Sequence, residues 1–152
     1  MLSPMMVLGL AALAVLVFAS IRRIPEGQVY TLRRVGGHTR VMHSGMHLML
    51  PLLERVAHKI SLTGANVPVD GLVAADQHYR GIVYFQVLDP ERADRVIDDV
   101  DGLLRERTRS LFADASLPDS FDGRRQWLKH SLNSDVRERG LLVTRVDLSA
   151  LN

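Results

Sequence analysis

Four of the six histidines lie close together in the first half of the chain, at His38, His43, His47 and His58. Neutral imidazoles are common ligands of zinc and copper, so this cluster is a candidate metal site. The chain contains no cysteine, however, and no nearby pair of carboxylates completes a ligand set. We therefore expect structural or surface roles for these histidines, and no bound metal.

Ser44, within the sequence His43-Ser44-Gly45, is a candidate nucleophile. It does not lie in a Gly-x-Ser-x-Gly turn, and no acidic partner for a catalytic triad is recognisable. The glycines lack the spacing of a phosphate-binding loop, and no Lys-Ser or Lys-Thr pair follows them. We expect no enzymatic activity and no cofactor.

Acidic residues and arginines are concentrated in residues 98–109. At helical spacing such charges form a solvated face with intrahelical ion pairs, each worth roughly a few tenths of a kcal/mol. The alternative is a contact between subunits, to which a tryptophan on a later helix contributes unless it belongs to the core. The candidate interface residues are Asp98, Asp101, Arg105, Arg109 and Trp127.

The composition is that of one folded domain. Hydrophobic residues make up 47% of the 152 positions and charged residues 24%, which excludes a disordered tail. The formal net charge is +2, and acids are spread among the arginines along the chain. Aromatic residues that stack on bases amount to 5%, so we expect no nucleic-acid partner.

Residues 2–21 carry no charged side chain. A helix of this length extends roughly 30 Å, which is the thickness of the hydrocarbon core of a bilayer. Ten of these residues are Leu, Ile, Val or Phe, and together they favour insertion by roughly 3 to 5 kcal/mol. We predict a single transmembrane anchor over residues 2–21, followed by a domain over residues 22–152.

A cleaved export signal is the alternative interpretation of this segment, with cleavage near Val17, Phe18 and Ala19. No Lys or Arg precedes the apolar run, which disfavours it. Arg22 and Arg23 follow the run directly, so the positive-inside rule predicts that the domain lies on the cytoplasmic side. The periplasmic side is the alternative.

The rest of the chain predicts an α+β fold. Short apolar and β-branched runs separated by turn residues indicate an antiparallel sheet, with strands at 28–34, 39–43, 56–62, 67–73 and 78–88. Asp89 and Pro90 then predict a helix start, and two helical pieces are expected before Pro118. A third amphipathic helix over 121–139 ends at Gly140, and a closing strand covers 141–148.

Five segments in order resemble the stomatin/prohibitin family, also called the SPFH or band 7 family. They are 24–29 (IPEGQV), 32–36 (LRRVG), 44–56 (SGMHLMLPLLERV), 83–93 (VYFQVLDPERA) and 140–148 (GLLVTRVDL). The sequence departs from the family pattern at 76–80 (DQHYR), which lacks the alternating valines of that hairpin, so a trimmed or irregular hairpin is expected. The long coiled-coil helix that usually follows the domain is also absent, which makes a large closed cage doubtful.

The resemblance implies a non-catalytic α+β domain beside a membrane that forms homo- or hetero-oligomers with SPFH-type subunits. It also implies that the protein organises lipids or modulates membrane proteases or channels. His47 lies where the family has a Gly-x-His turn, so we expect it to hydrogen-bond the local backbone. Two other functions stay open: an exported ligand- or metal-binding protein released by signal cleavage, and a truncated accessory subunit of a longer relative.

A short apolar run follows His47 and is too short to span a bilayer. Its proline disfavours both a central strand and a helix interior. It is either buried core or a shallow membrane-contact wedge, and the resemblance favours the wedge. The predicted membrane-contact residues are Leu48, Met49, Leu50, Pro51, Leu52 and Leu53.

Overall fold

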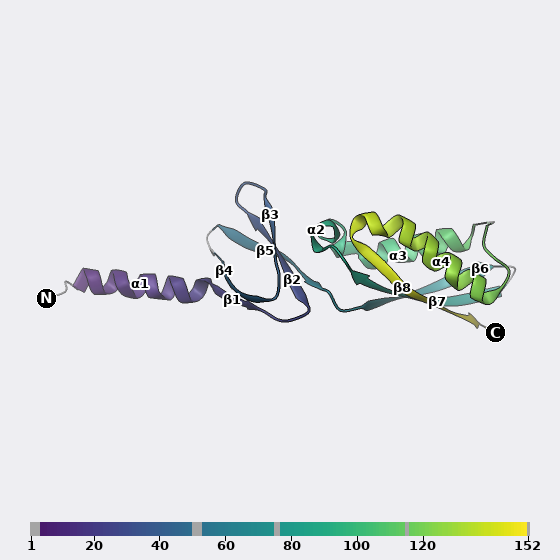
Figure 1. Ribbon diagram of the computed structural model, residues 1–152, viewed down its shortest axis with the longest axis horizontal. Coiled ribbons are helices and arrows are strands. Elements are labelled where there is room, and N and C mark those ends of the chain that lie inside the picture. The colour runs from purple at the N-terminus through teal and green to yellow at the C-terminus, as the bar shows by residue number, and fades with distance from the viewer. Residues whose placement is uncertain (1–3, 50–52, 75–76, 115, 152) are drawn as a thin grey trace. The chain divides into compact units, whose positions relative to one another are not determined.

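The computed structural model describes residues 4–49, 53–74, 77–114 and 116–151 and has an α+β fold (Figure 1). The predicted fold class is therefore confirmed. The chain divides into two compact units, residues 1–59 and residues 60–152, and the division falls within strand β5 (Glu54–Ser61). Each unit has its own hydrophobic core.

The first unit begins with a helix that leads directly into a strand. Helix α1 (Pro4–Ser20) is followed by β1 (Ile21–Ile24), which pairs antiparallel with β4 (Gly45–Leu48). A second sheet has the strand order β3-β2-β5, with β2 at Gln28–Arg34 and β3 at Thr39–Met42. Ile24, Leu32 and Met42 form the buried core of this unit.

The predicted transmembrane span over residues 2–21 is not supported by the structure. Helix α1 is 17 residues long, and Ile21 already belongs to β1, where it lies opposite Leu48. Among the residues that the structure describes, no helix has both the length and the apolar character needed to cross a membrane. The predicted helix is confirmed, but its length is not.

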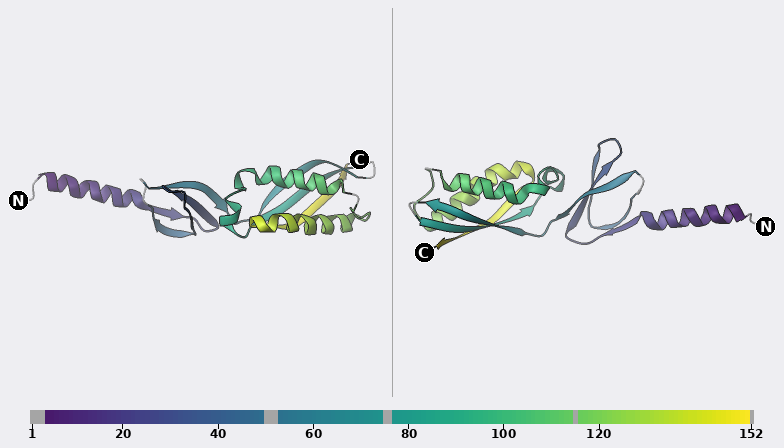
Figure 2. Two further views of the ribbon diagram at one scale, coloured as in Figure 1. Left: turned by 90° about the horizontal axis from the view of Figure 1, so that it is seen from above. Right: turned by 180° about the vertical axis from the view of Figure 1, so that it is seen from behind.

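The second unit is a three-stranded antiparallel sheet with two helices on one face (Figure 2). The strand order is β6-β7-β8, with β6 at Ala65–Ala74, β7 at Gln77–Val87 and β8 at Leu141–Leu151. Helix α3 (Val100–Phe112) contacts β6, and helix α4 (Phe121–Val136) contacts β8. Leu104, Leu128 and Leu132 are fully buried between these layers.

The helix boundaries follow the local sequence. The Asp89 carboxylate accepts hydrogen bonds from the backbone N–H groups of Glu91 and Arg92 at 3.1 and 3.2 Å, so the predicted cap of α2 (Pro90–Ala93) is confirmed. Two α-helices, α2 and α3, lie before Pro118 as predicted, and the short 3₁₀ helix η1 (Ile97–Asp99) lies between them. Helix η2 (Arg137–Arg139) extends α4, and Gly140 ends it in the left-handed conformation at φ 77°.

The predicted single sheet over the first half of the chain is wrong, because the predicted strands belong to two sheets, β3-β2-β5 and β6-β7-β8, and β1 and β4 form a third. Strand β8 is not regular along its length, because Val143 and Val146 are both buried although a regular strand would place them on opposite faces. A bulge places Phe85 opposite Val143 and Tyr84 opposite Arg145, so Thr144 is an extra residue. A second register shift lies between Val69 and Leu72, so the predicted irregular hairpin is confirmed.

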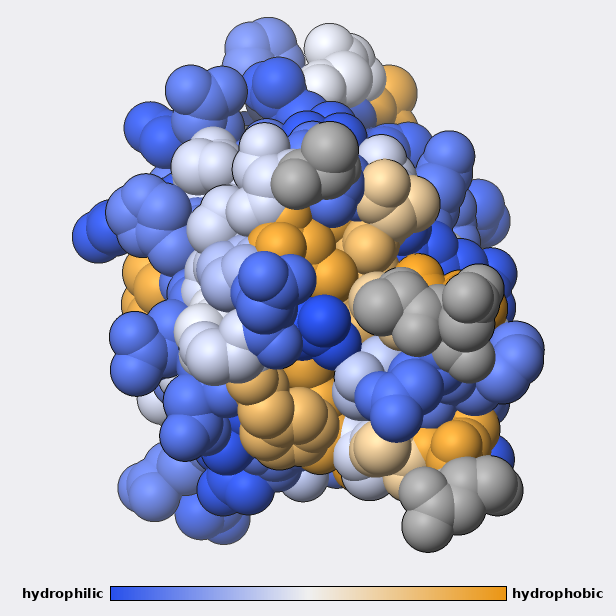
Figure 3. Space-filling model, turned by 90° about the vertical axis from the view of Figure 1, so that its right-hand side faces the viewer, coloured by the Kyte–Doolittle hydropathy of each residue, from blue (hydrophilic) through white to orange (hydrophobic). Residues whose placement is uncertain are grey.

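The face seen in Figure 3 is mainly hydrophilic. In the view of Figure 3, hydrophobic residues gather in the middle of one face and hydrophilic residues surround them. The large hydrophobic residues exposed in the second unit are Val73, Leu88, Phe121 and Leu151 among the described positions. Scattered exposed residues of this kind are normal for a soluble surface. The first unit differs in this respect.

Candidate membrane-contact and assembly surfaces

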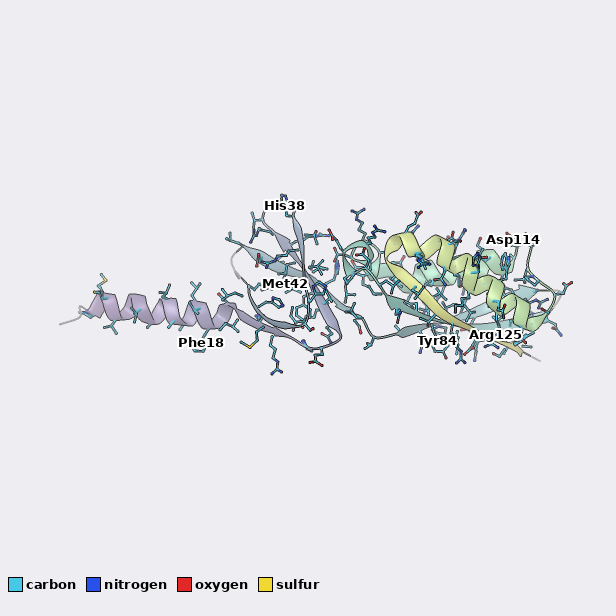
Figure 4. The ribbon with its side chains drawn as sticks, viewed as in Figure 1. Phe18, His38, Met42, Tyr84, Asp114 and Arg125 are labelled. Atoms are coloured by element: carbon cyan, nitrogen blue, oxygen red, sulfur yellow. The ribbon has the colours of Figure 1, made fainter. Side chains whose placement is uncertain are left out.

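Helix α1 exposes apolar side chains in every direction. Each of its residues from 4 to 19 is exposed, including Leu8 at 74%, Leu13 at 63% and Phe18 at 79%. Phe18 projects from the helix with no other element beside it in Figure 4. Soluble helices bury one apolar face and expose a polar one. All sides of this helix are therefore available for contact with lipid or with a partner protein.

The β1–β4 pair continues this apolar surface beyond the helix. Ile21 lies directly opposite Leu48, and these side chains are 42% and 64% exposed. Met46, two residues before Leu48 and therefore on the same face, is 74% exposed. The Met49 N–H donates to the Ser20 carbonyl at 2.8 Å, which ties the end of β4 to the end of α1.

The predicted wedge is only partly described by the structure. Leu48 and Leu53 are exposed, whereas Met49 is half-buried and packs against the core of its unit. Leu50, Pro51 and Leu52 lie outside the described residues. Met46 was not among the predicted membrane-contact residues, because its place on the apolar surface depends on the pairing of β1 with β4.

The first unit also contains a hollow of about 310 Å³. Its apolar lining combines buried core residues with half-buried ones, and its cationic residues come from β1 and β5. The lining residues are Arg22, Arg23, Ile24, Tyr30, Leu32, Met42, Met49, Val56 and Lys59. The Lys59 ammonium lies 5.4 Å from the centre of the Tyr30 ring, which is within the range of a cation–π contact.

The histidines do not form a metal site in the described part of the chain. His47 Nε2 donates to the His43 carbonyl at 2.8 Å, so the predicted local backbone contact is confirmed. His58 donates its backbone N–H to the Thr31 hydroxyl at 3.2 Å within the sheet. Among the described residues, no three His, Asp or Glu side chains come together to hold a metal ion.

The predicted interface arginines make contacts within the chain. Arg105 Nε donates to the Pro68 carbonyl at 3.1 Å, and Arg109 Nε donates to the Asp70 carbonyl at 3.2 Å. Both carbonyls belong to β6, which is an edge strand. Arg105 also lies 3.7 Å from Asp101, which is the intrahelical ion pair that the spacing predicts. These arginines thus cap backbone groups that an edge strand otherwise presents for pairing.

The remaining predicted interface residues are Trp127 and Asp98. Trp127 is half-buried and packs against the core of the second unit, and Asp98 is exposed in η1. A groove of about 410 Å³ is lined by residues of α3 and α4, in which Arg107 is paired with Asp135. That carboxylate raises the pKa of the Arg107 guanidinium through a hydrogen bond and its charge. An interface role for these residues stays a prediction.

The other edge of the three-stranded sheet is capped from α4. The Asn133 side chain accepts a hydrogen bond from the Val143 N–H at 2.8 Å and donates to the Val143 carbonyl at 2.9 Å. Arg125 Nε donates to the Val146 carbonyl at 3.2 Å, and its Nη2 donates to the Asp147 carboxylate at 2.8 Å. Side chains from α3 and α4 therefore form hydrogen bonds with backbone groups on both edge strands of this sheet.

Asp147 links two arginines on this edge. Its carboxylate accepts a hydrogen bond from Arg145 Nε at 2.7 Å as well as the bond from Arg125. The hydrogen bond from Arg145 lowers the pKa of Asp147, burial opposes this shift, and Arg125 adds to the lowering. A carboxyl whose pKa is lowered on folding stabilises the fold above its unfolded pKa, and this stabilisation is lost as the pH falls through the folded pKa.

We predict that Asp147→Asn lowers the free energy of unfolding of the second unit by about 1 kcal/mol at pH 7. The difference from the natural protein is expected to shrink below about pH 4, where the unfolded carboxyl begins to be protonated, and to vanish once the pH lies below the lowered pKa of the folded Asp147 carboxyl. Urea unfolding followed by the fluorescence of Trp127, the single tryptophan, measures it. Asp122→Asn is the control, because the Asp122 side chain is 86% exposed. A difference that persists undiminished at pH 2 contradicts the assignment.

The geometry defines a class of protein: a small α+β chain with an exposed apolar N-terminal helix and a separate helix-covered sheet. The chain matches no family model. It is 26% identical over 122 residues to the human "Stomatin-like protein 2, mitochondrial", which covers 74% of this chain and 33% of that protein. It is also 28% identical over 165 aligned residues to an uncharacterized protein of Mycobacterium tuberculosis, covering 96% of this chain and 43% of the relative.

These similarities are distant and cover only part of each relative. The chain spans between a third and a half of the length of these curated proteins. An uncharacterized protein of Schizosaccharomyces pombe is 24% identical over 86 residues, with 24% of its length covered. The similarity to a stomatin-like protein supports the relation to the SPFH family that the five sequence segments indicate.

Proposed function

We propose that this protein is a membrane-associated, non-catalytic scaffold or regulatory subunit of the stomatin type. The observation that carries the proposal is the apolar circumference of α1, exposed from residue 4 to residue 19. Water is an unfavourable environment for such a surface, because each apolar Å² left in water costs about 25 cal/mol. The distant similarity to a stomatin-like protein is a second, independent support.

We propose that lipid surrounds this helix. A membrane core requires side chains that are apolar on all sides, and it requires backbone groups that are satisfied within the helix. The neighbouring residues Ile21, Met46 and Leu48 extend the apolar surface, as in segments that lie in a membrane interface. Arg22 and Arg23 follow directly, which favours a cytoplasmic position for the rest of the chain.

Lateral association is the proposed mode of action. Attachment to a membrane raises the effective concentration of subunits, so weak contacts suffice for assembly. Because side chains cap backbone groups on both edges of the β6-β7-β8 sheet, we propose that copies meet through their helical faces and not by strand pairing. The partners would be lipids, further SPFH-type subunits, and a membrane protease or channel.

Alkaline extraction of membranes, followed by detergent solubilisation and mass-calibrated sizing, tests the proposal. We expect the full-length chain to stay in the membrane pellet and to size well above the 17.0 kDa of one subunit. A shortened, freely soluble monomer would overturn the proposal and favour the exported binding protein. A full-length monomer in the pellet would overturn the assembly step and favour an accessory subunit.

A further inference from the structure

We propose that the hollow of the first unit binds the headgroup region of one anionic phospholipid. This inference rests on the proposed membrane association, and it assigns a ligand to a site that the scaffold function alone does not require. The hollow has a volume of about 310 Å³, at the lower end of the range of small-molecule sites.

The floor of the hollow is apolar. Ile24, Leu32 and Met42 contribute core side chains that are 3%, 1% and 4% exposed, so this part of the site is held in place by packing. Val56 and Met49 are half-buried and complete the apolar part of the lining. A surface of this kind suits the glycerol and first acyl carbons of a lipid, and it offers nothing to a free phosphate ion.

The cationic lining supplies the charge that a phosphate diester needs. Arg22 and Arg23 lie on β1 and Lys59 lies on β5, and all three are exposed. Among the described residues, no carboxylate lines this hollow. Guanidinium groups bind phosphate oxygens with two parallel hydrogen bonds, and an ammonium acts as a point charge. The charge of the site therefore complements a single anionic headgroup.

The position of the hollow in the chain favours a membrane lipid over a soluble anion. Arg22 is the second residue after the end of α1, so it lies within about 7 Å of that end along the chain. If α1 is embedded in lipid, these cations are held at the depth of the headgroups. Acidic lipids attract basic residues at this depth, each contributing about a fivefold increase in affinity.

Native mass spectrometry of the full chain in a neutral detergent tests this site. The probes are dimyristoyl phosphatidylglycerol and dimyristoyl phosphatidylcholine at equal concentration, which have the same acyl chains. We expect one tightly bound phosphatidylglycerol per chain, and a loss of about 25-fold in its affinity when Arg22→Gln is combined with Lys59→Gln. The matched control combines Arg33→Gln with Arg55→Gln, which removes the same charge outside the hollow; we expect a change below about fivefold.

A second variant tests the site without changing any charge. Val56→Trp fills the apolar floor, and we expect it to reduce phosphatidylglycerol binding at least tenfold while circular dichroism stays unchanged. Equal binding of the two lipids, or equal losses in the hollow and control variants, would overturn the site. Displacement of the lipid by millimolar inorganic phosphate would assign the cations to a free anion and overturn it as well.

Flotation with vesicles separates the lipid site from membrane association. A chain that floats with vesicles of pure phosphatidylcholine but shows no preference for phosphatidylglycerol keeps its membrane association and lacks the lipid site. A chain that floats with no vesicle overturns both.

Discussion

Replacing Leu10 and Leu13 together by aspartate is expected to release the full-length protein from membranes. Both side chains are exposed on α1, at 70% and 63%, and neither contacts the core of its unit. An aspartate at the centre of an inserted helix costs about 2.5 to 3.5 kcal/mol, and each lost leucine removes about 0.5 kcal/mol of favourable insertion. The total of about 6 to 8 kcal/mol exceeds the roughly 3 to 5 kcal/mol that the whole apolar segment supplies.

Flotation of the expressed protein through a density gradient with cell membranes measures this effect. We expect the natural chain in the floating fraction and the doubly substituted chain in the soluble fraction. The pair Leu10→Ala and Leu13→Ala is the matched control, because alanine preserves the helix without adding charge, and this variant is expected to float. If the aspartate variant stays with membranes, another surface provides the attachment and the role assigned to α1 is wrong.

Local chemistry explains which parts of the fold were predicted. Strand β2 occupies the predicted residues, since it is bounded by turn residues that act within a few positions. The Asp89 cap and the Gly140 stop were predicted for the same reason, because a cap needs only its neighbours in sequence. The apolar helix near the N-terminus follows from composition alone, although its exact end does not.

Long-range pairing explains what was not predicted. Strands β1 and β4 have four residues each, which is too short for a clear alternation, and they pair residues as distant in sequence as Ile21 and Leu48. The capping roles of Arg105 and Arg109 join residues 37 and 39 positions apart, so spacing within the helix could not show them. The hollow combines residues of separate strands, and no sequence pattern marks it.

The sheet-edge contacts change the meaning of the charged residues on α3. From sequence, Arg105 and Arg109 are available for a second subunit. In the fold, each donates to a carbonyl of β6 and so stabilises its own unit. A surface for assembly can therefore not be assigned from charge pattern alone, because the same arginines serve the edge of the sheet.

The second large effect is expected at Gly140, which joins the end of η2 to β8. Its φ of 77° lies in the left-handed region, and an added Cβ would lie 2.3 Å from the Asp89 carbonyl oxygen. That oxygen belongs to the backbone at the start of α2, where the N–H groups of Leu88 and Asp89 donate to the Gly140 carbonyl at 2.9 and 3.1 Å. The added methyl group must therefore separate two backbone segments that are hydrogen-bonded to each other.

We predict that Gly140→Ala lowers the free energy of unfolding of the second unit by about 3 to 4 kcal/mol, from about 1 to 2 kcal/mol of left-handed strain plus the cost of the collision. Gly71→Ala is the matched control in the same unit, because Gly71 has a φ of 76° and no atom lies within 4 Å of its added Cβ. It should lose only the strain, about 1 to 2 kcal/mol. Urea unfolding followed by Trp127 fluorescence compares the two variants. Equal losses of unfolding free energy would show that the backbone segments around Asp89 and Gly140 move apart at no energetic cost. The close packing of this junction would then not limit the stability of the unit.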